Sequence, residues 1–578
     1  MNFCSTSPRW IAILGISCLV FIFASITPAT MAQQPTAPLA SATTSVSTAD
    51  LPPLPLSPIE KAQKDGTALQ LSLKDITKLA LQNNLDIAIQ DTQEQVSQQR
   101  IRQTYGDYDP KLTGTAGVNS QKTAITNYTN ASTAGFNKTD SATWNFTFTQ
   151  KVKTGGSIRA TWNSSRNDNN SSFSTFNPQY SGSTTISFTQ PLLQNLRIDS
   201  TRANIRLYNL DLKNTDSTFR QKVMDTISNI QNQYWSLVSA VRDYDIKRNS
   251  VKLAQINLRD NKKKVEVGTS APIDVTDAEA TLAQRQVDLI TSEMTILSQE
   301  NALRALISGN RNSEVWNQVI IPTEAAEFKE YKVIMDEAIT TALKNRPELE
   351  QSDISLRKID INRNLIANSR KWQLDLTGQF GSQGVAGPQS YKADAFTGTL
   401  ARDANGNLIP NTPIDLVGGL GNAYKTIFTQ GYTNWSVQFQ LTIPLRSRSI
   451  DAQIAQQDIS KRQELMNRKK TEQNIQVDVR NAVQQLETSR SQVLTAGESK
   501  RFAKERLDGE EKRFQAGLSQ NYLVLQRQQE LSTAEFTELQ ALINYKKSII
   551  TLQKAMYTLL ESNDFEVAKG SLNNVVFK

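Results

Sequence analysis

Residues 435–445 read Trp-Ser-Val-Gln-Phe-Gln-Leu-Thr-Ile-Pro-Leu, and this stretch decides the fold. Up to Ile443, every odd-numbered position is apolar and every even-numbered position carries a polar, uncharged side chain. A period of two predicts a β-strand with one apolar and one polar face. Pro444 ends the strand, and the sequence beyond it has the period of a helix. A strand therefore leads directly into a helix.

The same passage occurs earlier in the chain, where Gln190-Pro191-Leu192 corresponds to Ile443-Pro444-Leu445. Residues 73–87 similarly return at 335–349, which is 262 positions later (335 minus 73). Val267-Gly268-Thr269-Ser270 returns as Ala516-Gly517-Leu518-Ser519. Because order and spacing are kept, we interpret the chain as two tandem repeats, residues 71–320 and 321–578.

After each of the two prolines, apolar residues recur at alternating steps of four and three, which is typical of a coiled coil. In the first repeat these residues are Val223, Ile227, Ile230, Tyr234, Leu237, Val241 and Tyr244. One helix over residues 197–267 would be on the order of 100 Å long at about 1.5 Å per residue. Heptads resume beyond Gly268 and Gly517, which predicts helical hairpins at about 197–308 and 446–560.

The strands are predicted at about 110–190 and 373–444. Such alternation also fits a soluble sandwich with one wet face. The polar positions are small and uncharged and the apolar ones are rich in aromatics, which favours a membrane strand with lipid on one side and a lumen on the other. The first repeat carries extra strand-like sequence, 157–162, facing 144–150 across Thr154-Gly155-Gly156. It predicts either an added extracellular hairpin or a larger barrel.

The N-terminus is typical of an export signal, with Arg9, an apolar run and a small-residue cleavage site within residues 1–32. Residues 33–70 are rich in Pro, Ser and Thr and are predicted to form a disordered linker. Of 578 residues, only 38% are hydrophobic. The abundant uncharged polar residues suit long solvated helices and lumen-facing strands better than a dense globular interior.

Several function classes have little support. Histidine is absent, and the only cysteines, Cys4 and Cys18, lie in the predicted signal segment. No nucleophile elbow, phosphate-binding glycine loop or metal-ligand spacing is present, so we expect no enzyme activity, cofactor or metal. The net charge of +8 is spread along helices and interleaved with acids, which argues against nucleic-acid binding.

Two to four strands per repeat cannot close a membrane barrel, because even a narrow barrel takes about eight. Several chains must therefore contribute strands. Helices that follow those strands would inherit the circular arrangement and form a second, helical tube. The predicted fold is mainly α with membrane β.

The duplication, the strand-ending prolines and the two Gly turns resemble the TolC-like outer-membrane efflux proteins over about residues 71–562. The resemblance implies a homotrimer with four strands per chain, sharing a twelve-stranded β-barrel that continues into a periplasmic coiled-coil α-barrel. It implies a passive exit duct of a tripartite efflux or type I secretion system. The location would be the outer membrane of a Gram-negative-type cell, extending into the periplasm. The partners would be outer-membrane lipid, a periplasmic adaptor protein and an inner-membrane pump.

By the same resemblance, the two helical turns form the periplasmic tip that meets the adaptor. The residues concerned are Val267, Gly268, Thr269, Ala516, Gly517, Leu518 and Ser519. Asp274 and Asp277 follow Gly268 by six and nine residues and would form a ring of carboxylates at the entrance. The alternative is that these acids stabilise a helix start after Ser270. A different function class, a barrel-anchored coiled-coil stalk or adhesin, would need helices that run outward without returning.

Overall fold

The computed structural model describes residues 56–125, 135–171, 174–392, 399–429, 432–563, 565–567 and 575–577. The predicted signal peptide and the first part of the linker, to residue 55, lie outside these residues. In the part that is described, no helix combines the length and the apolar character needed to cross a membrane.

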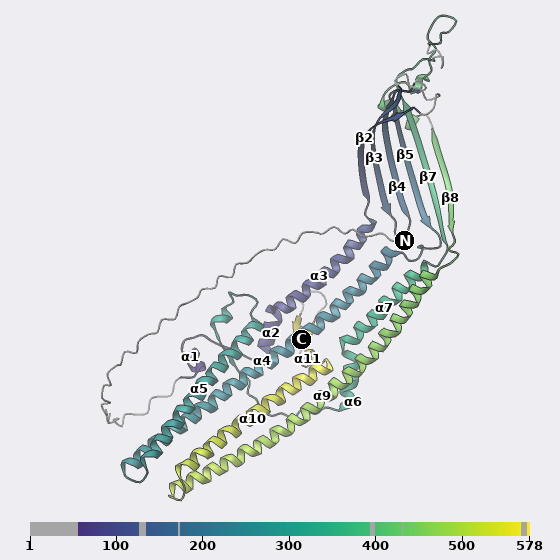
Figure 1. The fold of residues 1–578 in the computed structure, drawn as a ribbon. Helices are drawn as coiled ribbons and strands as arrows, with labels where there is room; N and C mark the ends of the chain where they lie inside the picture. The colour runs from purple at the N-terminus through teal and green to yellow at the C-terminus, as the bar shows by residue number, and fades with distance from the viewer. Residues whose placement is uncertain are drawn as a thin grey trace, which may run out of the picture. The chain divides into compact units, whose positions relative to one another are not determined.

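Six of the described strands form one large antiparallel sheet, in the order β2-β3-β4-β5-β7-β8, and Figure 1 shows them side by side. Their bounds are β2 Lys111–Ala124, β3 Phe136–Lys151, β4 Ser157–Asn169, β5 Gln179–Pro191, β7 Gln373–Ala386 and β8 Thr433–Thr442. The first repeat supplies four strands and the second supplies two. The expectation of four strands per chain is therefore wrong, because β3 and β4 are inserted into the sheet.

The inserted pair spans the sheet from end to end. Lys151 at the end of β3 pairs with Ser157 at the start of β4, which pairs with Thr189 near the end of β5. β5 continues into a helix, so the turn between β3 and β4 lies at the end of the sheet where the helices begin. An extracellular β3–β4 hairpin, one of the two alternatives from the sequence, is excluded. The pair widens the sheet.

Each repeat holds two shorter helices before its strands and a long helical hairpin after them (Figure 1). In the first repeat these are α2 Leu73–Asn83, α3 Leu85–Tyr105, α4 Ser200–Glu266 and α5 Pro272–Ile307. In the second they are α6 Met335–Asn345, α7 Pro347–Asn368, α9 Arg448–Gln515 and α10 Asn521–Met556. The long helices turn back on themselves at the two predicted glycines.

Smaller elements complete the fold. The helices are α1 Pro58–Lys64, α8 Leu420–Thr429 and α11 Leu559–Ser562, with single 3-10 turns η1 Gly106–Tyr108, η3 Glu314–Asn317 and η4 Ile414–Leu416. The strands β1 Ala68–Leu71 and β6 Val319–Pro322 pair in parallel, and β9 Phe565–Val567 pairs with β10 Val575–Phe577.

The prediction of a disordered linker up to residue 70 is wrong from Pro58 onward. Ser57 and Glu60 form a reciprocal capping box that starts α1. The Glu60 carboxylate also accepts a hydrogen bond from Arg248 of α4, with Nη1 and Oε1 2.9 Å apart. β1 then joins β6, so this part of the chain is held against the first hairpin.

Two apolar cores hold the helices together, one for each repeat. The first contains the α4 heptad residues Val223, Ile227, Ile230, Tyr234 and Leu237, together with Leu303 and Ile307 of α5. Leu539, Ile543 and Ile550 of α10 join this first core. The second core combines α6, α9 and the other face of α10, where Tyr545 is fully buried. Helix α10 is one arm of the second hairpin and also packs on the first hairpin, so it connects the two.

Candidate functional site

The six-stranded sheet has two chemically different faces. Residues paired across strands point to the same side, and successive residues alternate, so the register assigns every side chain to a face. One face is apolar and carries Leu112, Val118, Phe146, Phe148, Trp162, Ile186, Phe188, Phe380, Trp435, Val437, Phe439 and Leu441. Several of these side chains are open to the surroundings, and Trp435 is 76% exposed. A soluble protein rarely leaves so large an apolar surface bare.

The opposite face is polar and uncharged along most of its length. One continuous row across five strands reads Thr115, Asn145, Asn163, Ser183 and Gln383. Asn163 donates to Ser183 of the neighbouring strand, with Nδ2 and Oγ 3.4 Å apart. This composition matches the water-facing side of a membrane strand. The outermost strands of the described sheet, β2 and β8, each pair on one side only.

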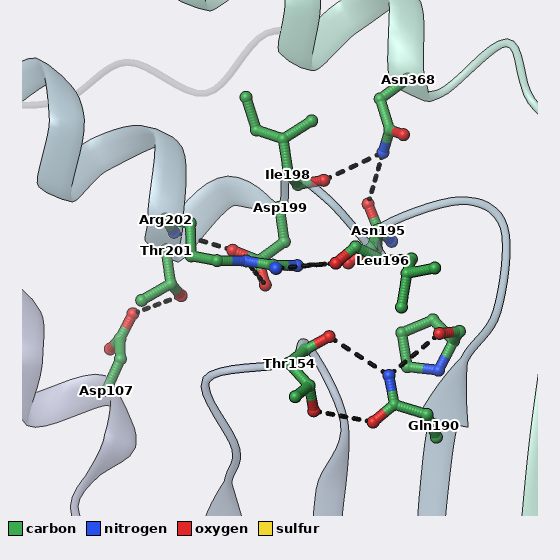
Figure 2. A network of polar contacts seen from close by, with 11 residues as sticks. Asp107, Thr154, Gln190, Asn195, Leu196, Ile198, Asp199, Thr201, Arg202 and Asn368 are labelled. Carbon is green, nitrogen blue, oxygen red and sulfur yellow. Dashed lines mark hydrogen bonds and ion pairs between the residues drawn. The ribbon is translucent and has the colours of Figure 1, made fainter.

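The strands are tied to the helices by Arg202, near the start of α4 (Figure 2). Its guanidinium donates to the main-chain oxygen of Leu196, with Nη1 2.7 Å from the oxygen, and to that of Asn195. It also pairs with Asp199, with Nε and Oδ2 3.1 Å apart. The Arg202 guanidinium thereby fixes the connection between β5 and α4.

The turn between β3 and β4 packs directly against this connection. A Cβ atom on Gly155 would lie 2.6 Å from the Asn195 oxygen and 2.9 Å from Arg202 Nη2, so a larger residue does not fit. Gly155 also has a φ of 91°, which favours glycine. Thr154 Oγ1 donates to Gln190 Oε1 at 2.7 Å, which links the turn to β5 (Figure 2).

The second repeat joins the same junction through Asn368, the last residue of α7. Its Nδ2 donates to Asn195 Oδ1 at 3.1 Å and to the Ile198 oxygen at 3.0 Å (Figure 2). On the other side, Thr201 Oγ1 donates to Asp107 Oδ2 of η1 at 3.0 Å. The junction therefore gathers the strand–helix transitions of both repeats.

The tip of the first hairpin is a glycine turn. Gly268 has a φ of 74°, and Thr269 N donates to the Lys264 oxygen at 2.8 Å, which closes the end of α4. Val267 is 72% exposed. A Cβ on Gly268 would touch nothing within 4 Å, so the φ angle alone selects glycine here.

The second tip repeats this geometry. Gly517 has a φ of 73°, and Leu518 N donates to the Arg513 oxygen at 2.8 Å. Ser519 donates to Glu510, and Ala516 caps the C-terminal end of α9, which ends at Gln515. Leu518 is 74% exposed, as Val267 is on the first tip. Both tips therefore present an apolar side chain to the surroundings.

The two hairpins are linked close to their tips. Lys264 Nζ of α4 lies 3.4 Å from the centroid of the Phe514 ring of α9, a cation–π contact. Asn257 Nδ2 of α4 donates to Asn521 Oδ1 of α10 at 2.7 Å, and Asn257 Oδ1 accepts from Asn261 at 2.7 Å. These asparagines are buried. Sequence reasoning missed both links, because each depends on residues more than 240 positions apart.

The two acids predicted at the entrance occupy different environments. Asp274 Oδ2 accepts from Ser270 Oγ at 2.9 Å and from Ala271 N at 3.2 Å, as expected of an acid that stabilises a helix start. Asp277 lies one turn further along α5 and is exposed. Within the described residues, no group of three or more acidic side chains could hold a metal ion.

The sequence matches the outer membrane efflux protein family over residues 151–309 and 338–556. Among solved structures, the chain is similar to the CmeC outer membrane channel of Campylobacter jejuni, at 17% identity over 84% of this chain and 86% of that one, with a TM-score of 0.57. The VceC outer membrane protein of Vibrio cholerae matches at 12% identity over 84% and 95% of the two chains, with a TM-score of 0.56. The open state of the MtrE outer membrane channel of Neisseria gonorrhoeae matches at 14% identity over 84% and 89%, with a TM-score of 0.55.

Among curated proteins the sequence has no match. The structural likenesses concern the fold, whereas the family match spans most of both repeats. Together they confirm the resemblance found in the sequence, and they locate the chain in the outer membrane with an extension into the periplasm. The chain belongs to the outer membrane efflux protein family.

Proposed function

We propose that the chain is one protomer of a homotrimeric exit duct in a tripartite efflux or type I secretion system. The duct carries small molecules or proteins outward passively and performs no chemistry. The observation that carries this proposal is the sheet, with an exposed apolar face on one side and an uncharged polar face on the other. A lipid-embedded wall around a water-filled pore requires that arrangement.

The strand directions support the proposed ring, because they allow neighbouring copies to pair edge to edge. All neighbours in the six-stranded sheet are antiparallel, so β2 and β8 at its two edges run in opposite directions. β8 of one copy can therefore pair with β2 of the next, again antiparallel, and copies arranged head to tail close into a ring. Three six-stranded sheets give 18 strands in place of the twelve that the resemblance implied.

At the other end, the two glycine turns are proposed to contact a periplasmic adaptor, which in turn engages an inner-membrane pump. Val267 and Leu518 supply exposed apolar side chains for that contact. Gly268, Thr269, Ala516, Gly517 and Ser519 shape the turns around them.

Asp274 and Asp277 remain the candidate entrance ring, with Asp277 the more exposed of the two. Three carboxylates at a constriction would favour cations. We expect trivalent cations to block the conductance, and the block to weaken in Asp277→Ala. Asp508→Ala, which also removes one acid from a hairpin, serves as the control and keeps the block. An unchanged block in Asp277→Ala would remove Asp277 from the proposed ring.

The function is tested by planar-bilayer conductance of the detergent-purified protein together with its mass. A particle of about three chain masses that gives steady currents supports the duct. A water-soluble monomer without conductance contradicts it. The stalk or adhesin alternative is disfavoured because α5 and α10 return along α4 and α9.

A further inference from the structure

Helix α8 lies on the sheet itself, against β5 and β7. Two glycines paired across these strands, Gly182 and Gly384, form its seat. A Cβ on Gly384 would lie 2.0 Å from the Ala423 oxygen, and one on Gly182 would lie 3.0 Å from Ile427 Cδ1. The helix therefore rests directly on the strand backbones, with Ala423 and Ile427 buried beneath it.

The register shows which face carries the helix. Gly182 pairs with Ser164, and Ser164 pairs with Trp144. These residues alternate in step with Trp162 and Phe146, so they belong to the apolar face. Tyr424 of α8 confirms the side, because its hydroxyl accepts from Trp144 Nε1 at 2.9 Å. The helix thus lies on the face that the proposed function turns toward lipid.

Along the strands, α8 marks the border of the apolar surface. On the same face, moving away from the helical junction, Ser164 is followed by Arg166 and Asp168, whose charged groups pair at 3.0 Å. On β3, Trp144 is similarly followed by Asp140 and its ion-pair partner Lys138. Charged pairs beyond an apolar band are expected where a membrane gives way to water.

Helix α8 carries side chains suited to that border, both on its exposed side and where it meets the sheet. Phe428 is 73% exposed, and its ring centroid lies 6.1 Å from that of Trp162. Tyr424 meets the same Trp162 ring edge-on, with centroids 5.2 Å apart. Lys425 is exposed beside them. Aromatic rings with a lysine on a short amphipathic helix are typical of elements that lie in a lipid–water interface.

We propose that α8 is an interfacial helix on the outside of the duct, in contact with outer-leaflet lipid at the level of the headgroups. Phe428 enters the boundary between headgroups and acyl chains, next to Trp162, and Lys425 extends toward the headgroups. The glycine seat allows the helix to lie flat on the wall. This inference rests on the proposed function, because it needs the apolar face to contact lipid.

The test uses the full chain, with Cys4→Ser and Cys18→Ser so that one added cysteine is the only thiol. The added cysteine is labelled with an environment-sensitive fluorophore, and the labelled protein is placed in phosphatidylcholine vesicles. The three positions are Phe428→Cys on α8, Val437→Cys on the apolar face and Gln438→Cys on the polar face. Quenching is measured with lipids brominated near the headgroup, with lipids brominated deep in the acyl chain, and with aqueous iodide.

We expect the label at 428 to be quenched most by the shallow brominated lipid, the label at 437 by the deeper one, and the label at 438 by iodide alone. Quenching at 428 by iodide without quenching by either lipid would overturn the role of α8 and leave the duct standing, provided that 437 and 438 behave as expected. If 437 responds only to iodide, the sheet is not in the membrane, and the proposed function and the role of α8 both fail.

Discussion

Replacing Glu300 by alanine should open the connection between the two repeats. Glu300 lies on α5 with 1% of its side chain exposed, and its Oε1 accepts from Arg304 Nη2 at 2.7 Å. The same oxygen accepts from the main-chain N of Ile320 in β6 at 2.6 Å. One buried carboxylate therefore fixes the strand that leads from the first hairpin into the second repeat.

The magnitude follows from what alanine leaves behind. Arg304 would remain largely buried without its counter-charge, and Ile320 N would lose its acceptor. Removing one partner of a buried ion pair costs about 3–5 kcal/mol. The lower figure corresponds to roughly a hundredfold change in an equilibrium constant, since about 1.4 kcal/mol is tenfold.

Hydrogen exchange measures this locally. The amide of Ile320 and its neighbours in β6 should exchange at least about a hundred times faster in Glu300→Ala. Glu300→Gln keeps an acceptor for Ile320 N and should show a smaller effect. Glu498→Ala is the matched control, because it breaks a largely exposed pair with Arg501 and should leave the exchange of Ile320 unchanged. Unchanged exchange of Ile320 in Glu300→Ala would refute the reasoning.

Three further predictions address the junction, a buried acid and a tip. Arg202→Ala should lower the free energy of unfolding by about 2–3 kcal/mol and expose residues 192–199 to protease. Arg202→Lys should retain only part of this stability, because lysine lacks the planar guanidinium group. Burial raises the pKa of Asp243, opposed by Lys247 and reinforced by Asp288. Because the pKa of Asp243 is higher in the folded state, the free energy of unfolding falls as the pH rises from the ordinary aspartate pKa through the folded-state pKa. Asp243→Asn should therefore raise Tm at pH 7 and leave Tm nearly unchanged at pH 3. An equal gain in Tm at pH 7 and at pH 3 would contradict this. Gly517→Ala should speed amide exchange around the second tip by a factor corresponding to about 1–2 kcal/mol, with a smaller change in Gly517→Asn, and equal effects would argue against the φ angle as the cause.

The long hairpins could be predicted because their signal is local and repeated. The heptads around Tyr234 and the glycines at 268 and 517 lie where the sequence indicated, and those glycines have the positive φ that a reversal needs. The expectation of four strands per chain came from the family resemblance. The sequence itself showed the extra strand pair, β3 and β4. It did not show at which end of the sheet the β3–β4 turn lies, because that depends on the pairing of Ser157 with Thr189.

Other features could not be predicted from the sequence, for physical reasons. The composition of residues 33–70 indicated a linker, yet the capping box at Ser57 and the contact of Glu60 with Arg248 order its last part. The Arg202 junction and the seat of α8 are contacts between distant segments, and no local period signals them. For Asp274 the sequence allowed two roles, a member of a carboxylate ring or an acid that stabilises a helix start. The structure shows the hydrogen bonds of the second role.

The central claim is that the sheets of three copies close into one lipid-embedded wall. Electron cryomicroscopy of the detergent-purified protein tests it most directly. We expect a hollow trimer whose wall holds 18 strands, with β8 of each copy paired to β2 of the next and Trp435 facing the detergent. A solid particle, or a sheet whose β2 and β8 edges stay unpaired, would contradict it.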